Sequence, residues 1–227
     1  MPAVLFVFTS CNKTLTGNQT GWYLPEAAHP YYVLKNHGIT IDFASPAGPN
    51  PPVDEGSVKA FAEDAQSTEF LDDEAVREKF AAAKKLSEVD VAYYDGIFYV
   101  GGHGPVIDLA SDTANIELAS KFYRGGKITS AVCHGPAALV GVTDDNGRSI
   151  FAGKRVTGFS DAEEIEVGKV KDVPFLLEQR IKDLGGNYEK AAEPWGSKVV
   201  VDGNLITGQN PNSAVGVGEK ILEALSK

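Results

Sequence analysis

The residue best suited to covalent chemistry in this chain is Cys133, which opens the tetrapeptide Cys133-His134-Gly135-Pro136. A thiol can attack a carbonyl carbon, and a neighbouring imidazole can take up its proton. The apolar run 127–132 reads as a strand and residues 137–140 read as helical, so the thiol is predicted on a tight strand-to-helix turn resembling a nucleophile elbow. The helix start predicts a lowered thiol pKa. The alternative reading of Cys133 is a small buried hydrophobe.

Two further groups are expected at the same edge of the sheet. Glu26 lies near the start of the first predicted helix, just after the first strand, where open α/β sheets bind ligands. Burial would raise its pKa and let it donate and accept a proton near neutral pH. The segment Gly101-Gly102-His103-Gly104 follows another central strand, and glycine N–H groups can approach an anionic oxygen closely. The alternatives are a helix-start carboxylate for Glu26 and a plain turn for His103.

The remaining histidines and the second cysteine are weaker candidates. His29 lies one helical turn after Glu26 and could face the pocket, whereas His37, near a helix end, is expected to be structural. Cys11 ends the first strand and is expected to be a packed bystander. Two cysteines form neither a disulfide framework nor a zinc pattern, so we expect free thiols and no metal site.

The hydrophobic pattern predicts strands that alternate with helices. Strands are expected at 4–8, 39–43, 96–100, 127–132, 155–158, 198–201 and 205–207. Helices are expected at 25–36, closed by Gly38 at its C′ position, at 111–124 and from about Ser213. This alternation predicts an α/β, doubly wound, mostly parallel sheet sandwiched by helices. Asp202-Gly203 predicts a hairpin between the last two strands.

One long segment interrupts this alternation. Residues 44–64 carry four prolines among small and polar residues, which indicates a surface excursion, and a charged helix is expected over about 72–85. We therefore expect a single domain over residues 1–227 with a surface insertion at about 44–85.

The composition excludes several classes of protein. The 227 residues are 43% hydrophobic and 23% charged, as in an ordinary soluble globule, and no apolar run approaches the roughly 18 residues that span a bilayer. The formal charge of −10 opposes binding to nucleic acid. The first residues lack the features of a secretory signal, so a cytoplasmic location is expected.

Several segments, taken in order, resemble a known family. The segment Ala131-Val132-Cys133-His134-Gly135-Pro136 resembles the nucleophile motif of the PfpI superfamily, whose fold is flavodoxin-like and related to class I glutamine amidotransferases. Within it the chain is similar to the heat-shock-chaperone-type branch of glutathione-independent glyoxalases, also called glyoxalase III. Supporting segments lie at 21–30, 101–104, 157–161, 194–195 and 207–211. The resemblance covers essentially the whole chain.

The resemblance implies roles for individual residues. Cys133 would be the nucleophile, His134 its acid/base partner, and Glu26 the proton-handling group beside the sulfur. An acidic residue after Phe159 would orient His134. Glu164 is preferred for this role.

Asp161 and Glu163 remain alternatives for the orienting acid, because the preceding loop can vary in length. The resemblance further implies that the N–H groups of Gly102 and His134 form an oxyanion hole, and that His103 belongs to the substrate-binding part of the site.

The implied activity is the conversion of methylglyoxal to D-lactate without glutathione, through a hemithioacetal on Cys133. No cofactor is expected, and glyoxal is expected as a second substrate. The resemblance also implies a stress-response role, a homodimer, and a nuclear as well as a cytoplasmic location. The alternatives are a holdase chaperone, a deglycase of glycated proteins or nucleotides, a cysteine peptidase or amidase, and a redox sensor with an accessible thiol.

Overall fold

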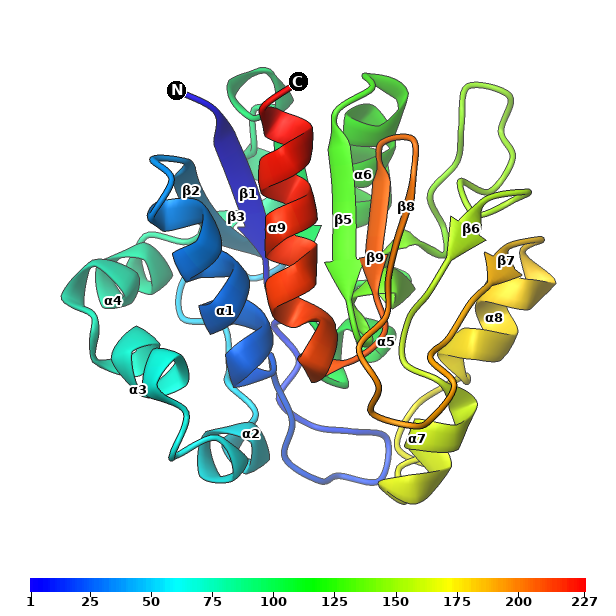
Figure 1. Ribbon diagram of the computed structural model, residues 1–227, viewed down its shortest axis with the longest axis horizontal. Helices are drawn as coiled ribbons and strands as arrows, with labels where there is room; N and C mark the ends of the chain where they lie inside the picture. Colours follow the sequence, from blue (N-terminus) through cyan, green and yellow to red (C-terminus); the bar gives the residue numbers. More distant parts are fainter.

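A seven-stranded sheet with strand order β3-β2-β1-β4-β5-β9-β8 forms the centre of the computed structural model, which describes all residues from 1 to 227 (Figure 1). Its strands are β1 (Ala3–Val7), β2 (Thr40–Ser45), β3 (Lys84–Lys85), β4 (Gly96–Tyr99), β5 (Ile128–Val132), β8 (Val199–Asp202) and β9 (Leu205–Gly208). Only the β8–β9 hairpin is antiparallel. The predicted α/β fold with a mostly parallel sheet is confirmed.

Helices cover both faces of this sheet. On one face α1 (Leu24–Lys35) packs beside α9 (Ala214–Leu225), and α6 (Thr113–Arg124) lies on the other (Figure 1). Gly218 allows the close approach of α1 and α9, because a Cβ there would lie 2.9 Å from the Cα of Pro30. The C-cap of α1 is Asn36, so Gly38, with φ of +76°, falls one residue beyond the predicted C′ position.

The predicted strand at 155–158 is shorter than expected and lies outside the main sheet. Strand β6 (Arg155–Val156) pairs with β7 (Asn187–Tyr188) in a separate two-stranded sheet. Beyond β6 the backbone N–H groups find other acceptors: Thr157 donates to the Thr207 hydroxyl and Phe159 donates to the Cys133 carbonyl. These bonds draw the chain toward the end of β5, and the helices α7 (Asp161–Glu166) and α8 (Leu177–Asp183) follow.

The segment 44–85 differs from its prediction. It contains α2 (Glu55–Ala60), α3 (Ala65–Asp72) and α4 (Glu74–Ala81), and the side chain of an aspartate caps the start of each helix. The charged helix expected over about 72–85 is present as α4 but ends earlier, at Ala81, because Lys84 and Lys85 form β3 at the edge of the sheet. Phe70 is fully buried against Trp22 and Tyr31, so this segment contributes to the core.

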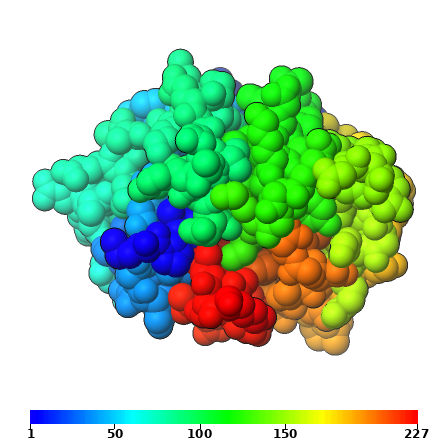
Figure 2. All heavy atoms as spheres, turned by 90° about the horizontal axis from the view of Figure 1, so that it is seen from above, coloured from blue at the N-terminus to red at the C-terminus, as the bar shows by residue number.

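The chain termini and the candidate site residues lie at opposite ends of the sheet. Both termini lie at the upper end in Figure 1, and seen from there the first residues lie beside the end of α9 (Figure 2). The strands β1, β4 and β5 run toward the opposite end, where residues 101–104 and Cys133 leave the sheet. No helix has the length and apolar character needed to cross a bilayer.

Candidate active site

Cys133 occupies a strained turn directly after β5. Its φ is +59°, a left-handed value that a residue with a side chain adopts only at some cost. Two backbone hydrogen bonds hold the turn: the N–H of Cys133 donates to Gly208, and its carbonyl oxygen accepts from Phe159. The following helix, η3 (Gly135–Leu139), is a 3₁₀ helix of five residues. Cys133 thus has the backbone geometry of a nucleophile elbow.

The carboxyl group of Glu26 faces the Cys133 thiol. Glu26 lies in the first turn of α1, is completely buried, and neither of its oxygens has a hydrogen-bond partner. Burial raises its pKa well above the usual value, and the nearby Cys133 thiol and Gly101 N–H offset this only in part. A carboxyl group in this state can hold a proton at neutral pH.

The predicted lowering of the Cys133 pKa is wrong. Burial raises the pKa of the thiol well above its usual value, a negative charge on Glu26 would raise it further, and the Gly102 N–H lowers it only partly. The physical reason is that Cys133, 4% exposed, lies next to a buried acid. The resting thiol is therefore protonated, and a base must take up its proton during attack.

Two glycines allow Glu26 and Cys133 to come together. A side chain on Gly101 would collide with the Glu26 carboxyl group and lie 2.7 Å from the Val132 carbonyl oxygen. Gly102 has φ of +97°, and its N–H lies beside the sulfur of Cys133. A backbone N–H in this position can stabilise an oxyanion that forms on an atom bonded to the sulfur.

His134 connects the thiol to Glu164. Its Nδ1 lies 3.5 Å from Sγ of Cys133, and its Nε2 lies 2.6 Å from Oε2 of Glu164, which comes from α7. The three side chains form a nucleophile, base and orienting acid in the expected order. Sequence reasoning preferred Glu164 over its neighbours, and Glu164 is the acid that contacts His134.

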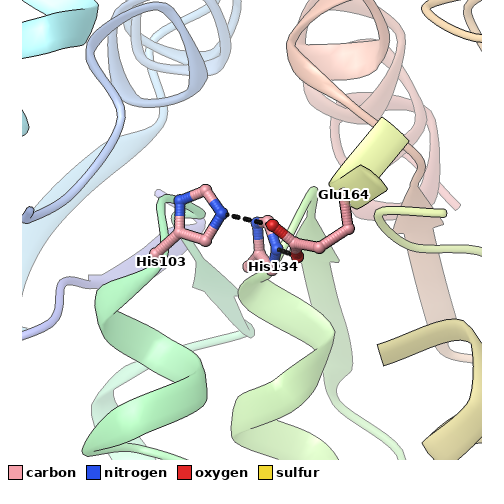
Figure 3. A group of neighbouring side chains, drawn as sticks. All are labelled: His103, His134 and Glu164. Carbon is pink, nitrogen blue, oxygen red and sulfur yellow. Dashed lines mark hydrogen bonds and ion pairs between the residues drawn. The ribbon is translucent and has the colours of Figure 1, made fainter. Parts of the chain in front are cut away.

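His103 makes an unexpected second contact with Glu164. Its Nε2 lies 2.7 Å from Oε1, so one carboxylate connects two imidazole rings (Figure 3). Burial would raise the pKa of Glu164, but the two histidines outweigh it and hold the pKa well below its usual range. Burial and the neighbouring His134 lower the pKa of His103 to about 4. His103 is therefore neutral at neutral pH and donates its Nε2–H to an ionised Glu164.

The other two acidic candidates have different partners. Glu163 is buried, forms a capping box with Ser160, and accepts hydrogen bonds from the Trp195 N–H and the side chains of Gln209 and Asn210. The hydrogen bond from Trp195 holds its loop against α7, where Glu163 lies. Asp161 only starts α7, and its N–H donates to Glu178. Neither contacts His134.

A small cavity opens onto the thiol. It encloses about 170 Å³, and Gly102, His103, Cys133 and His134 contribute to its wall. Sequence reasoning did not identify the other main lining residues, which are Tyr23, Asp54, Phe159, Val167, Lys169 and Trp195. Only Tyr23, Phe159 and Trp195 had a signal, since they fall in the family-like segments. A larger hollow of about 520 Å³, lined by Gly203 and Lys220 among others, contains none of the catalytic candidates.

The weaker candidates lie elsewhere. His29 does not line the cavity but pairs with Asp64, the N-cap of α3, at 2.9 Å, so the expectation that it could face the pocket is wrong. His37 is exposed and bonds to the Val33 carbonyl oxygen within its own helix end. Cys11 is half-buried, and its thiol donates to the Lys13 carbonyl oxygen.

The two histidines and Glu164 are also the group most suited to hold a metal ion. Their ligand atoms lie within 4.8 Å of one another, a proximity that the sequence did not indicate. Two nitrogens and one carboxylate oxygen are ligands that zinc accepts. Each carboxylate oxygen is nevertheless already paired with an imidazole nitrogen, so the hydrogen bonds account for the cluster on their own.

Comparisons with known proteins give consistent results. The sequence model of the DJ-1/PfpI family matches residues 20–224. The chain is 32% identical to the glutathione-independent glyoxalase HSP31 of Saccharomyces cerevisiae, over 98% of this chain and 97% of the relative. It resembles the crystal structure of glyoxalase III from Candida albicans with a TM-score of 0.88 and 31% identity, over 98% of this chain and 97% of that one.

A second structure is similar over the same length. The X-ray structure of the Francisella tularensis Rapid Encystment Protein 24 kDa matches with a TM-score of 0.93 and 37% identity, over 99% of each chain. Because the family match covers most of the sequence and the relatives align along nearly their whole length, this chain belongs to the DJ-1/PfpI family.

Proposed function

We propose that this protein is a glutathione-independent glyoxalase that converts methylglyoxal into D-lactate. The observation that carries the proposal is a thiol that lines a cavity of about 170 Å³ and also faces a fully buried carboxyl group, that of Glu26. The thiol can attack an aldehyde, and the carboxyl group can move the proton that follows. Full-length relatives named as a glutathione-independent glyoxalase and as glyoxalase 3 support this proposal.

The first step forms a bond between the Cys133 sulfur and the aldehyde carbon. The thiol proton passes to Nδ1 of His134, 3.5 Å away, while Glu164 stabilises the imidazolium that forms. The aldehyde oxygen gains negative charge beside the Gly102 N–H and then takes the proton from His134. The product is a hemithioacetal on Cys133.

The second step moves a proton between the two carbons. The ionised form of Glu26 removes the proton from the carbon bonded to sulfur, which gives an enediolate, and the protonated carboxyl group then delivers this proton to the neighbouring carbon. The hydroxyl proton of the hemithioacetal moves to the other oxygen, which leaves a carbonyl group on the carbon bonded to sulfur. The raised pKa of Glu26 suits both the removal and the delivery of the proton, because the protonated carboxyl group persists long enough to act as the donor. The result is a thioester of lactic acid on Cys133.

Water then hydrolyses the thioester to lactate and regenerates the thiol. The protein's own thiol replaces that of glutathione, so the chemistry needs no cofactor. The reverse reaction removes water from lactate, and we therefore class the enzyme as a D-lactate dehydratase, a hydro-lyase. The small cavity suits methylglyoxal and glyoxal rather than a peptide, which disfavours a peptidase or amidase.

A holdase chaperone is a second candidate that one observation favours. Four apolar side chains are exposed in two segments that a hydrogen bond joins, since the Leu15 N–H donates to the Asp172 carbonyl oxygen: Leu15 in one segment, and Ile165, Val167 and Val170 in the other. Val167 also lines the cavity. Unfolded polypeptides bind such surfaces. Suppression of aggregation by Cys133→Ala, and its loss in Ile165→Ser/Val170→Ser, would establish this activity separately from the enzyme.

The test of the main proposal is lactate formation in a buffer that contains no thiol. Purified protein with a chelator and methylglyoxal should produce D-lactate, measured with stereospecific lactate dehydrogenases. Cys133→Ala should produce none, while the matched variant Cys11→Ser should keep wild-type activity. Wild-type protein that consumes no methylglyoxal would refute the proposal. The homodimer and the cytoplasmic and nuclear location remain predictions.

A further inference from the structure

His103 has one ring nitrogen that no protein group uses. Its Nε2 donates to Glu164, whereas its Nδ1 has no hydrogen-bond partner and is not sealed within the protein. His103 lines the cavity together with Cys133 and His134. Figure 3 shows the second nitrogen of the His103 ring turned away from Glu164. A neutral imidazole that donates through one nitrogen presents a free lone pair on the other.

In the resting enzyme both ring nitrogens of His134 already have partners. Its Nδ1 faces the sulfur of Cys133 and its Nε2 faces Glu164. Once the sulfur carries an acyl group, His134 is neutral, because it has given its proton to the aldehyde oxygen, and its Nδ1 still lies beside the sulfur. A base whose free lone pair opens onto the cavity can position and activate the water that attacks the thioester.

We propose that His103 is the base that activates water for hydrolysis of the Cys133 thioester. This inference rests on the proposed function, because a thioester forms only if Cys133 attacks the substrate. A water molecule in the cavity donates to Nδ1 of His103. As the water oxygen bonds to the thioester carbon, its proton moves to Nδ1. The carbon–sulfur bond then breaks, the electron pair returns to the Cys133 sulfur, and the proton taken up by Nδ1 of His103 is passed on to restore the thiol. The product leaves as lactic acid, which ionises to lactate.

The shared carboxylate explains how two histidines can act in turn. Glu164 stabilises a positive charge on either ring, since each Nε2 contacts one of its oxygens. The ring centroids are 4.2 Å apart, so a charge on one imidazole opposes a charge on the other. His134 is charged during thiol attack and His103 during hydrolysis.

The experiment measures the covalent intermediate directly. Wild type, His103→Gln and His103→Asn are mixed with methylglyoxal and quenched with acid, and intact-protein mass spectrometry gives the fraction that carries the acyl group. Hydroxylamine, which cleaves thioesters, identifies the linkage. The matched control is Glu164→Gln, which disturbs both histidines and should slow thiol attack, so that no intermediate accumulates.

We expect lactate turnover in both His103 variants to fall by about 10²-fold, the usual contribution of a general base, while the thioester accumulates. Gln preserves a donor toward Glu164, so accumulation in His103→Gln separates loss of Nδ1 from loss of positioning. Slower turnover without a thioester in either variant, or unchanged turnover, would overturn the inference. Wild-type protein that forms no lactate would instead refute the proposed function.

Discussion

Cys133 and Glu26 form a buried pair in which the charge of one group affects the other. Burial raises both pKa values, so the uncharged forms are favoured at rest. This arrangement protects the thiol from indiscriminate reaction and keeps a proton available beside it. Reactivity then depends on His134 and on a carbonyl group that arrives in the cavity.

We predict that Glu26→Gln changes how stability depends on pH. Because the folded-state pKa of Glu26 lies above its unfolded value, the native protein binds more protons between the two, and its free energy of unfolding falls as pH rises. The glutamine variant lacks this loss and should gain stability relative to wild type as the pH rises above the usual carboxyl pKa of 4.5. Urea denaturation of wild type and Glu26→Gln at several pH values measures the difference in their free energies of unfolding. A difference that does not change with pH would contradict the raised pKa of Glu26.

We predict the opposite pH dependence for His103. Its pKa of about 4 lies below the usual value of 6.5, so the unfolded chain binds more protons between these values. Stability should fall on acidification through that window by up to about 3 kcal/mol. Below about pH 4.5 the depressed pKa of Glu164 should add a further loss. His103→Gln should flatten the curve, whereas exposed His37→Gln should leave it unchanged. Parallel curves for wild type and His103→Gln would disprove the effect.

At the scale of single residues, the sequence predicted which residues form the site better than it predicted their pKa values. Cys133, His134 and Glu26 could be placed because each follows a predicted parallel strand. The bond between His103 and Glu164 could not, because it depends on how the loop before α7 returns to the sheet. The raised thiol pKa was missed because the depth of burial is set by the packing of the whole fold.

At the scale of elements, the turn after β4 is as important as the turn that carries the nucleophile. We predict that Gly102→Ala reduces activity by at least about 10²-fold, because the N–H beside the sulfur would shift. Gly102 has φ of +97°, and a Cβ there would meet Gly21 and lie 3.0 Å from the Tyr23 nitrogen.

The matched control for this prediction is Gly17→Ala. Gly17 has φ of +87°, but a Cβ added there would have no neighbouring atom within 4 Å, so it shares the backbone cost without the collision. Steady-state assays and unfolding curves of both variants separate the two effects. Equal losses of activity in the two variants would show that the close approach of Gly102 is unimportant.

The sequence predicted long, periodic elements more successfully than short ones. Strands β1, β4 and β5 are buried along their whole length, so they could be located from their apolar runs. Strand β3 has two lysines and no apolar signal, so only its pairing with β2 defines it. Helices α2 and α3 were missed because they are only six and eight residues long and each begins at a single aspartate cap.

At the scale of the whole molecule, the segment 44–85 packs against the helix that carries Glu26. Phe70 is fully buried and contacts the rings of Trp22, which precedes α1, and Tyr31, which lies within the helix that carries Glu26. We predict that Phe70→Ala lowers the free energy of unfolding by about 3–5 kcal/mol. Tyr93→Ala, at a side chain that is 59% exposed, should change it by less than about 0.5 kcal/mol. A small loss for Phe70→Ala would mean that the segment is a dispensable insertion.

The central claim is that Cys133 bonds to the aldehyde carbon of the substrate, and carbon NMR with methylglyoxal labelled at that carbon tests it most directly. Glu26→Gln should stop the reaction after the first step and show a protein-bound hemithioacetal resonance distinct from the free hydrated aldehyde. The double variant Glu26→Gln/Cys133→Ala should show none, while Glu26→Gln/Cys11→Ser should retain it. A bound resonance that survives Cys133→Ala would contradict the account.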